Sequence, residues 1–179
     1  MNNGKKFENA IGKSAIKQGI LYERFKDNGK FGFSQETRFS SQNPCDCFMF
    51  ANGKLFYIEL KSTIGTSISF NQPCDKKGNG TYMIKPHQVK SLIERSKYKD
   101  VYCGLLLDFA DRENAKDEVI EGGTYYIDIN TFAGWTKVIN KKSINKKDAE
   151  VIGIKVNRKL KKVNYEYDIK TMLNKIVCC

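Results

Sequence analysis

Residues 44–61 read PCDCFMFANGKLFYIELK. Two strand-like runs, 45–51 and 54–61, are rich in aromatic and aliphatic side chains and flank the dipeptide Asn52-Gly53. Asn-Gly is the preferred sequence of a two-residue turn in which both residues adopt a positive φ. The pattern therefore predicts a tight β-hairpin.

The turn also fixes which residues of the hairpin face one another. A two-residue turn pairs Ala51 with Lys54, so Asp46 is expected directly opposite Glu59. Lys61 comes two residues after Glu59 and shares its face, because side chains alternate along a strand. The other face is expected to lie in the core and carries Cys47, Met49, Ala51, Phe56, Ile58 and Leu60.

Two carboxylates on facing strands lie about 5 Å apart and repel each other unless something positive separates them. Carboxylate oxygens beside a lysine suit a hard divalent cation such as Mg²⁺. Lys61 could then bind a phosphate or lower the pKa of an attacking water. The alternative is an ordinary ion cluster on a surface hairpin, in which Lys61 neutralises one acid. Against that alternative, the strand 56–61 places two charges among apolar residues, where they need a reason.

The rest of the chain shows further helical and strand-like patterns. Apolar residues at helical spacing predict a helix over 5–25, and Pro86 is expected to open a second one. Val101–Phe109 is nearly all apolar, which is typical of a central strand. Residues 65–84 and 110–122 are expected to be loops. The remaining predicted elements are strands at 124–129, 151–156 and 163–167 and helices at 131–138 and 168–177.

Composition limits the function classes. The chain has 179 residues, a net charge of +11 and no apolar run long enough for a membrane span. Residues 137–175 hold 12 Lys/Arg against 4 Asp/Glu, which favours a polyanionic partner, although a solvated lysine-rich surface is the alternative. The N-terminus lacks the apolar region of a signal peptide, so a cytoplasmic location with free cysteine thiols is expected. No phosphate-binding Gly-x4-Gly-Lys-Ser/Thr loop is present, which disfavours ATP use.

Several motifs resemble one nuclease family. The sequences PCD at 44–46 and ELKST at 59–63 resemble the PD-(D/E)XK nuclease motif, with one extra residue between the proline and the acid. IKPHQV at 84–89 and KSINKKD at 142–148 extend the resemblance to the RecU-type Holliday junction resolvases of low-GC Gram-positive bacteria and their phages. The similarity covers most of residues 5–170. It implies a restriction-endonuclease-like α/β fold, in which helices flank a mixed β-sheet.

The resemblance implies a role for each matching residue of the hairpin. Asp46 and Glu59 would ligate Mg²⁺ or Mn²⁺, together with the carbonyl oxygen of Leu60. Lys61 would position or activate the attacking water.

Two further residues match the family outside the hairpin. Glu8 corresponds to the acid that such nucleases bring from their first helix; the alternative is a first-turn glutamate favoured by the helix dipole. Gln88 corresponds to a glutamine that orients the catalytic lysine or the water; the alternative is a solvated helix position. His87 is expected to be a plain residue of the first helical turn, although contact with a phosphate is the other interpretation.

The segment between the first helix and the hairpin departs from the family. RecU-type enzymes carry a long stalk there that enters the centre of the junction, whereas the corresponding segment of this chain, residues 30–42, is short. Lys30 and Arg38, with nearby aromatic residues, could form a short prong that contacts DNA, or the aromatic residues could pack partly in the core. A reduced stalk would weaken the selectivity for junctions.

These observations predict a single nuclease domain over 1–179. Its parts are the first helix (5–25), a short stalk-like segment (30–42), a catalytic core (43–130) and a basic C-terminal segment (137–177). The lysines expected to contact phosphates in the basic segment are Lys141, Lys142, Lys146 and Lys147.

The leading hypothesis is a homodimeric, Mg²⁺-dependent endonuclease that cuts paired strands of four-way double-stranded DNA in recombination and repair. Two alternatives stay open. One is a restriction- or repair-type nuclease that acts on linear duplex or forked DNA. The other is a non-catalytic module that binds branched DNA. Four-way symmetry favours a dimer, because a two-fold axis presents two sites to two equivalent strands.

Overall fold

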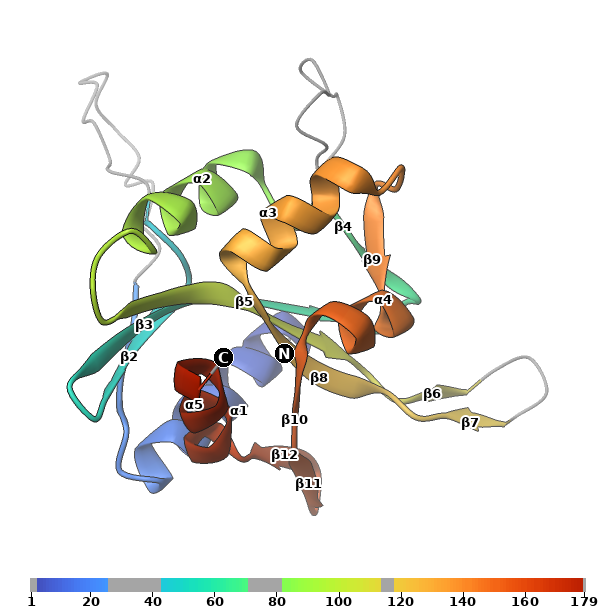
Figure 1. The fold of residues 1–179 in the computed structure, drawn as a ribbon. Coiled ribbons are helices and arrows are strands. Elements are labelled where there is room, and N and C mark those ends of the chain that lie inside the picture. The colour runs from blue at the N-terminus through green and yellow to red at the C-terminus, as the bar shows by residue number, and fades with distance from the viewer. Residues whose placement is uncertain (1–2, 26–42, 71–81, 114–117, 179) are drawn as a thin grey trace, which may run out of the picture.

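A six-stranded mixed sheet forms the centre of the molecule (Figure 1). The computed structural model describes residues 3–25, 43–70, 82–113 and 118–178. The strands, in their order across the sheet, are β1 (Leu21–Arg24), β2 (Cys47–Ala51), β3 (Lys54–Thr63), β5 (Val101–Phe109), β8 (Gly123–Asp128) and β10 (Ile154–Val156). Only β3 and β5 pair in parallel, and the other neighbours in this sheet are antiparallel. The predicted mixed α/β fold is confirmed.

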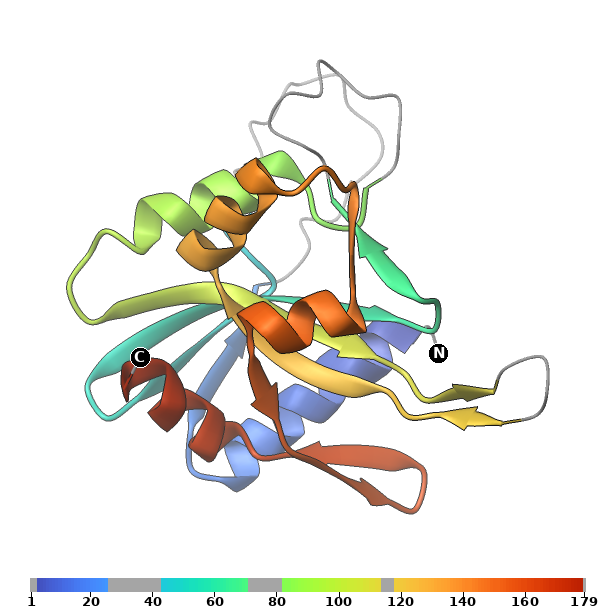
Figure 2. The same ribbon diagram turned by 45° about the vertical axis from the view of Figure 1, so that its right-hand side comes forward.

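Helices cover both faces of this sheet (Figures 1 and 2). One face packs against α1 (Asn3–Lys17) and α5 (Ile169–Cys178). The opposite face packs against α2 (Pro86–Arg95), α3 (Ile129–Val138) and α4 (Lys146–Ile152). Helix α2 crosses between β3 and β5, which is the connection that a parallel strand pair requires.

Three short strand pairs lie outside the central sheet. They are β4 (Ser67–Ser69) with β9 (Ser143–Asn145), β6 (Arg112–Glu113) with β7 (Val119–Ile120), and β11 (Arg158–Lys161) with β12 (Asn164–Tyr167). The β11–β12 hairpin leads into α5 on the α1 side of the sheet (Figure 2). No helix in the described ranges is long and apolar enough to cross a membrane.

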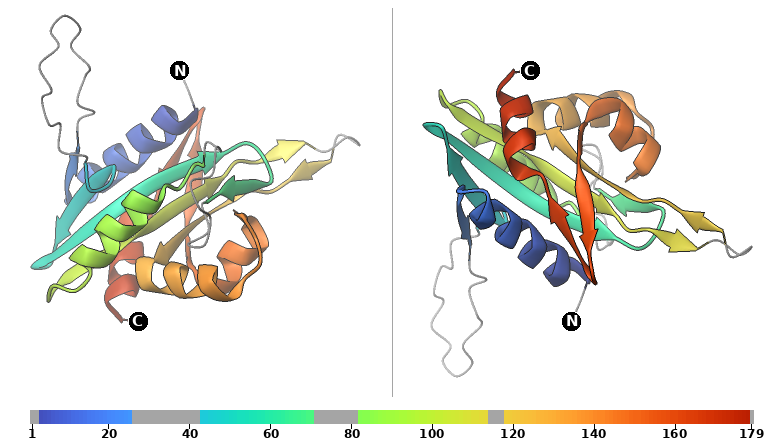
Figure 3. Two further views of the ribbon diagram at one scale, coloured as in Figure 1. Left: turned by 90° about the horizontal axis from the view of Figure 1, so that it is seen from above. Right: turned by 90° about the horizontal axis from the view of Figure 1, so that it is seen from below.

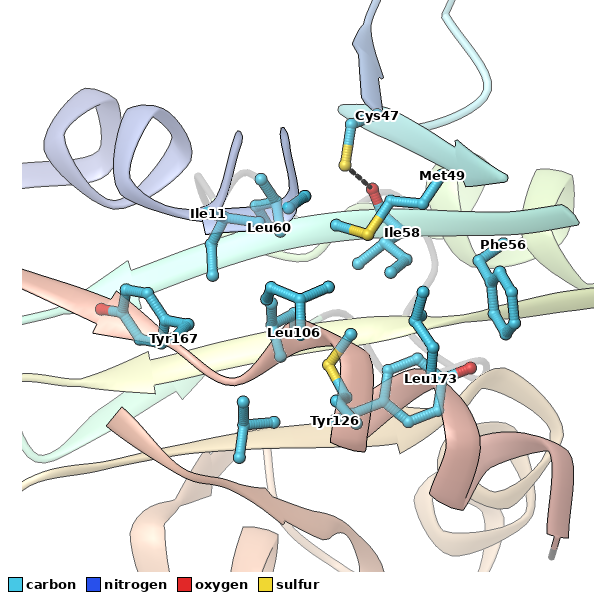
Figure 4. Close-up of a cluster of buried hydrophobic side chains, with 14 of the residues drawn as sticks. Ile11, Cys47, Met49, Phe56, Ile58, Leu60, Leu106, Tyr126, Tyr167 and Leu173 are labelled. Atoms are coloured by element: carbon cyan, nitrogen blue, oxygen red, sulfur yellow. Dashed lines mark hydrogen bonds between the residues drawn. The ribbon is translucent and has the colours of Figure 1, made fainter. Parts of the chain in front are cut away.

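The core beneath α1 and α5 is built from the inner face of the predicted hairpin (Figure 4). Met49 and Ile58 are fully buried there and pack with Ile11 of α1 and Leu173 of α5. Burial of each such side chain contributes about 2 kcal/mol. The β2–β3 hairpin is therefore held rigidly by its apolar face.

The hairpin register is as predicted. Ala51 pairs with Lys54, and the ladder continues to Cys47 opposite Ile58. Both turn residues have the expected positive φ, 51° at Asn52 and 73° at Gly53. The ladder ends one position before Asp46, so this residue meets the second strand through its side chain.

The prediction of a helix over 5–25 is wrong in its second half. Helix α1 ends at Lys17, and Gly19 adopts a left-handed φ of 73° that stops it. The chain then turns back as β1, which pairs with β2. Ile16, one of the apolar residues at helical spacing, is 64% exposed.

Three other predicted boundaries differ from the structure. The predicted strand at 151–156 begins only at Ile154, because Asn145 caps α4 through a hydrogen bond from the Asp148 N–H and the helix runs to Ile152. The expected loop at 65–84 contains β4, whose Ile68 is fully buried. The expected loop at 110–122 contains the β6–β7 hairpin.

Candidate active site

Asp46, Glu59 and Lys61 meet at the end of the hairpin remote from its turn. The Leu60 N–H donates a hydrogen bond of 2.8 Å to Asp46 Oδ2, in place of the missing ladder bond. Lys61 Nζ lies 3.5 Å from the same Asp46 oxygen and also donates to Glu59 Oε1. The structure therefore brings together the three residues that the register argument selected.

Glu59 is fully buried, which the sequence did not predict. Its Oε1 accepts hydrogen bonds from Lys61 and Gln88, whereas its Oε2 is buried without a hydrogen-bond partner among the described residues. Burial raises the pKa of this carboxyl from 4.5 to about 7; Lys61 opposes the rise and Asp46 adds to it. A buried, half-satisfied acid of this kind is costly, which makes Glu59 the centre of the candidate site.

Lys61 carries the positive charge of the group. Burial favours its neutral form, but Glu59 and Asp46 outweigh burial, so the net effect raises the pKa of Lys61. Its side chain is 16% exposed. The raised pKa favours the charged form of Lys61, which is suited to stabilise negative charge.

Gln88 lies in the same site. It occupies the first turn of α2, where its Oε1 accepts a hydrogen bond of 2.9 Å from the Lys85 N–H. Its Nε2 donates to Glu59 Oε1. The amide is thus locked at the helix N-terminus and aimed at the buried acid, which does not fit the alternative of a solvated helix position.

Glu8 lies across β1 from the hairpin. Its carboxylate forms an ion pair of 2.8 Å with Arg24, and its side chain is 17% exposed. Arg24 pairs with Cys47 in the β1–β2 ladder, and the next residue, Phe25, donates its N–H to the Asp46 carbonyl oxygen at 3.0 Å. Strand β1 thus links the two acids: Arg24 at its end pairs with Glu8, and the next residue, Phe25, bonds to the backbone of Asp46. His87 is exposed, and burial, Lys85 and Lys61 lower its pKa.

The donor set fits a hard divalent cation. Two carboxylates converge, and the buried Glu59 Oε2 has no hydrogen-bond partner among the described residues. The Leu60 N–H points toward Asp46, and the carbonyl of a strand residue projects from the same edge as its N–H. No cluster of three His, Cys, Asp or Glu side chains occurs within the described part of the chain. Mg²⁺ does not need one, because it is commonly bound through one or two carboxylates and retains several waters.

All four lysines of the basic segment that were predicted to bind DNA are at least partly exposed. Lys141 forms an ion pair of 2.7 Å with Asp148, and Lys146 donates to the Glu121 carbonyl oxygen at 2.9 Å. Lys142 and Lys147 are exposed. The other two predicted contacts, Lys30 and Arg38, lie outside the described residues, as does the stalk-like segment.

Sequence reasoning missed an aromatic cluster beside the hairpin. The rings of Phe25 and Tyr57 stack with their centroids 6.3 Å apart, and Phe48 packs against both. Arg95 of α2 lies over the Tyr57 ring at 5.5 Å. Alternation along the two strands placed Phe48 and Tyr57 on this face, but Phe25 was assigned to a helix, so the cluster was not recognised.

The surroundings of Arg158 were also not predicted from the sequence. It was counted in the basic segment, yet its side chain is only 10% exposed and binds Asp108 and Asp111 at 2.9 and 2.6 Å. Thr124 donates to the same Asp108 oxygen. Burial raises the pKa of Asp108, while Thr124 and Arg158 act in the opposite direction. Arg158 therefore fixes β11 to the end of β5 and is not a free cation.

Comparison with solved structures gives the class of fold. The chain is similar in fold to Hjc of Archaeoglobus fulgidus, a Holliday junction resolvase, with a TM-score of 0.52 and 13% sequence identity. The match covers 85% of this chain and 95% of that one. At this identity the likeness establishes the fold alone.

Comparison of sequences gives the family. No protein-family model matches the chain. It is 34% identical over 188 aligned positions to the SPbeta prophage-derived protein YotM of Bacillus subtilis strain 168, covering 98% of this chain and 87% of that protein. The chain belongs to the family of YotM.

Proposed function

We propose that this protein is a metal-dependent endonuclease that cuts four-way DNA junctions. The observation that carries the proposal is the convergence of Asp46, Lys61 and Gln88 on a fully buried Glu59, whose second oxygen has no hydrogen-bond partner among the residues that the structure describes. A fold shared with a Holliday junction resolvase supports the same conclusion. The net charge of +11 suits a DNA substrate.

Each residue of the site has a distinct task in this proposal. Asp46, Glu59 and the Leu60 carbonyl oxygen would hold Mg²⁺ or Mn²⁺. The bound cation would supply a Lewis acid that polarises a phosphate oxygen and lowers the pKa of a water. Lys61, as an ammonium, stabilises the charge that develops on the phosphate and orients the attacking water.

Gln88 and Glu8 act from the two sides of the hairpin. Gln88 is a positioning residue, because it fixes the Glu59 carboxylate through Oε1 and leaves Oε2 for the cation. Glu8 would reach the site through water or serve a second cation, and its pairing with Arg24 sets the position from which it would act.

The finer assignment is a RecU-type resolvase that acts as a homodimer. A single nuclease domain would place one site in each subunit, and the two-fold axis would present the two sites to the two equivalent strands of a junction. Lys142 and Lys147, which are exposed, are the first candidates for phosphate contacts in the basic segment.

Substrate preference tests this function. The protein is incubated in Mg²⁺ with a mobile four-way junction, a replication fork and a linear duplex of matching sequence. The proposal predicts that the junction is cut fastest and on paired strands. Equal cutting of junction and linear duplex would instead indicate a restriction- or repair-type nuclease. Junction binding without cleavage would indicate a non-catalytic module.

A further inference from the structure

Helix α1 and the β11–β12 hairpin lie side by side on one face of the central sheet (Figures 2 and 3). A groove lies between them, on the face opposite to Glu59 and Lys61. It encloses about 240 Å³ and is called the α1–hairpin groove below. Its walls are joined by the ion pair of Lys17 with Glu166, at 2.8 Å, and by a hydrogen bond of 3.0 Å from the Tyr167 N–H to Ser14 Oγ. The groove is thus a fixed feature of the fold.

The lining of this groove is strongly basic. Four lysines contribute to it: Lys6, Lys13, Lys17 and Lys161. Among the described residues that line it, Glu166 is the only acid, and that acid already pairs with Lys17. Lys6, Lys13 and Lys161 are all exposed. Three positive charges therefore face the groove beyond those that its own acid can neutralise.

The lysines of α1 form one stripe. Lys6, Lys13 and Lys17 are separated by seven and four residues, so they project from the same side of the helix and span about 16 Å along it. One DNA strand carries a phosphate every ~3.4 Å of helix axis, so such a stripe runs past about five phosphates. Lys13 and Lys17 are like charges one turn apart, which destabilises the isolated helix. A bound polyanion would offset the repulsion between these two lysines, because each lysine would then lie near a negative charge.

A second hollow links the α1–hairpin groove to the catalytic edge of the sheet. It encloses about 250 Å³ and shares Lys6, Asn164 and Tyr165 with the groove. Its far end is lined by Ser62 and Thr63, which directly follow Lys61 on β3. This hollow also contains Asp108 and Asp111, both paired with Arg158, so the excess of basic side chains begins at Lys6 and continues along α1.

We infer that the α1–hairpin groove binds the sugar-phosphate backbone of the DNA arm that flanks the scissile phosphate. This inference rests on the proposed function for the position of the cut, but the groove itself is defined by its own charge and shape. It adds a phosphate-binding surface on the α1 face to the lysines of the basic segment near α4. Contacts of this kind position DNA without reading its sequence.

Binding of a four-way junction oligonucleotide, measured in EDTA over a range of salt concentrations, tests the inference. The test variant combines Lys6→Gln, Lys13→Gln and Lys161→Gln, which leaves the pair of Lys17 with Glu166 intact. The matched control combines Lys90→Gln, Lys97→Gln and Lys99→Gln, three exposed lysines outside both the groove and the basic segment with the same total charge. Circular dichroism confirms that both variants are folded.

The inference predicts a smaller salt dependence for the test variant alone. Each lost phosphate contact lowers the slope of log affinity against log salt by about one, so the triple variant should lose up to about three. Its affinity at about 0.15 M salt should fall on the order of tenfold or more. An unchanged slope in the test variant would overturn the inference and would indicate that the groove serves another partner, such as an acidic protein. An equal loss in the control would also overturn it, because the effect would then depend on total charge and not on the groove.

Cleavage by the unaltered protein in Mg²⁺ is scored separately. A lost slope in a protein that never cuts DNA would support the groove and remove the proposed nuclease activity. Cleavage by the unaltered protein together with an unchanged slope in the test variant would remove the groove and keep the nuclease.

Discussion

Glu59→Gln should stabilise the metal-free protein at alkaline pH while abolishing its activity. Burial raises the pKa of Glu59 from 4.5 to about 7, so the folded protein holds this proton more tightly than the unfolded chain does. Such a contribution to stability is fully present below pH 4.5 and is lost as the pH rises through 7. The difference corresponds to about 3 kcal/mol, most of which should disappear between pH 5 and pH 8. Glutamine has the same shape and no proton to lose, so the variant lacks this loss.

Urea unfolding in EDTA at pH 5 and pH 8 measures this effect in both proteins. The comparison between them cancels groups that titrate identically, including His87. The unaltered protein should lose about 2–3 kcal/mol more than Glu59→Gln over this range. Mg²⁺ at pH 8 should restore stability to the unaltered protein and not to the variant, because the cation pairs with the ionised carboxylate. Equal pH dependence in the two proteins would show that Glu59 is not a buried acid with a raised pKa, and the argument for the metal site would lose its main support.

Three other substitutions test separate parts of the account. Lys61→Met should lower the single-turnover cleavage rate on the order of 100-fold or more, because the charge on the phosphate loses its fixed ammonium; a near-normal rate would contradict that role. Gln88→Ala removes both the hydrogen bond to the Lys85 N–H and the bond to Glu59, so urea unfolding should show a loss of about 1–2 kcal/mol and cleavage should slow, whereas Gln88→Glu should slow cleavage without the first loss. Gly53→Val should cost about 1–2 kcal/mol, because valine resists the φ of 73°; the control Gly134→Ala, in open space on α3, should be neutral or stabilising.

The hairpin was predictable because short-range chemistry dictates it. The Asn52-Gly53 turn fixes the pairing, and the pairing alone brings Asp46 beside Glu59 and places Lys61 on their face. The long apolar strand β5 was equally clear, since nine consecutive residues show a single pattern. In these two elements the local signal and the tertiary packing agree.

Burial of Glu59 could not be predicted, because it depends on what covers the strand. In the sequence of β3, Glu59 and Lys61 alternate with apolar residues, which is the pattern of a strand with one exposed face. Only the packing of α2 brings Gln88 over the Glu59 carboxylate. The same reason explains the error at the first helix. Apolar spacing continued past Lys17, but pairing of β1 with β2 stabilises a strand there, which no local pattern reveals.

The count of charged residues predicted the sign of the surface charge but not how the charged side chains are arranged. The basic segment was read as one footprint, whereas the structure buries Arg158 between two aspartates and pairs Lys141 with Asp148. The α1–hairpin groove joins Lys161 to lysines near the opposite end of the chain, so only the tertiary structure could show it.

Cleavage of a four-way junction by the unaltered protein and by Asp46→Asn tests the central claim most directly. Asparagine keeps an oxygen that can accept the Leu60 N–H, so the hairpin end should keep its shape while it loses one charged ligand. The account predicts paired cuts by the unaltered protein in Mg²⁺, none in EDTA, and none by Asp46→Asn although it still binds the junction. Cleavage that persists in EDTA, or in Asp46→Asn at the normal rate, would contradict a metal-dependent site at Asp46, Glu59 and Lys61.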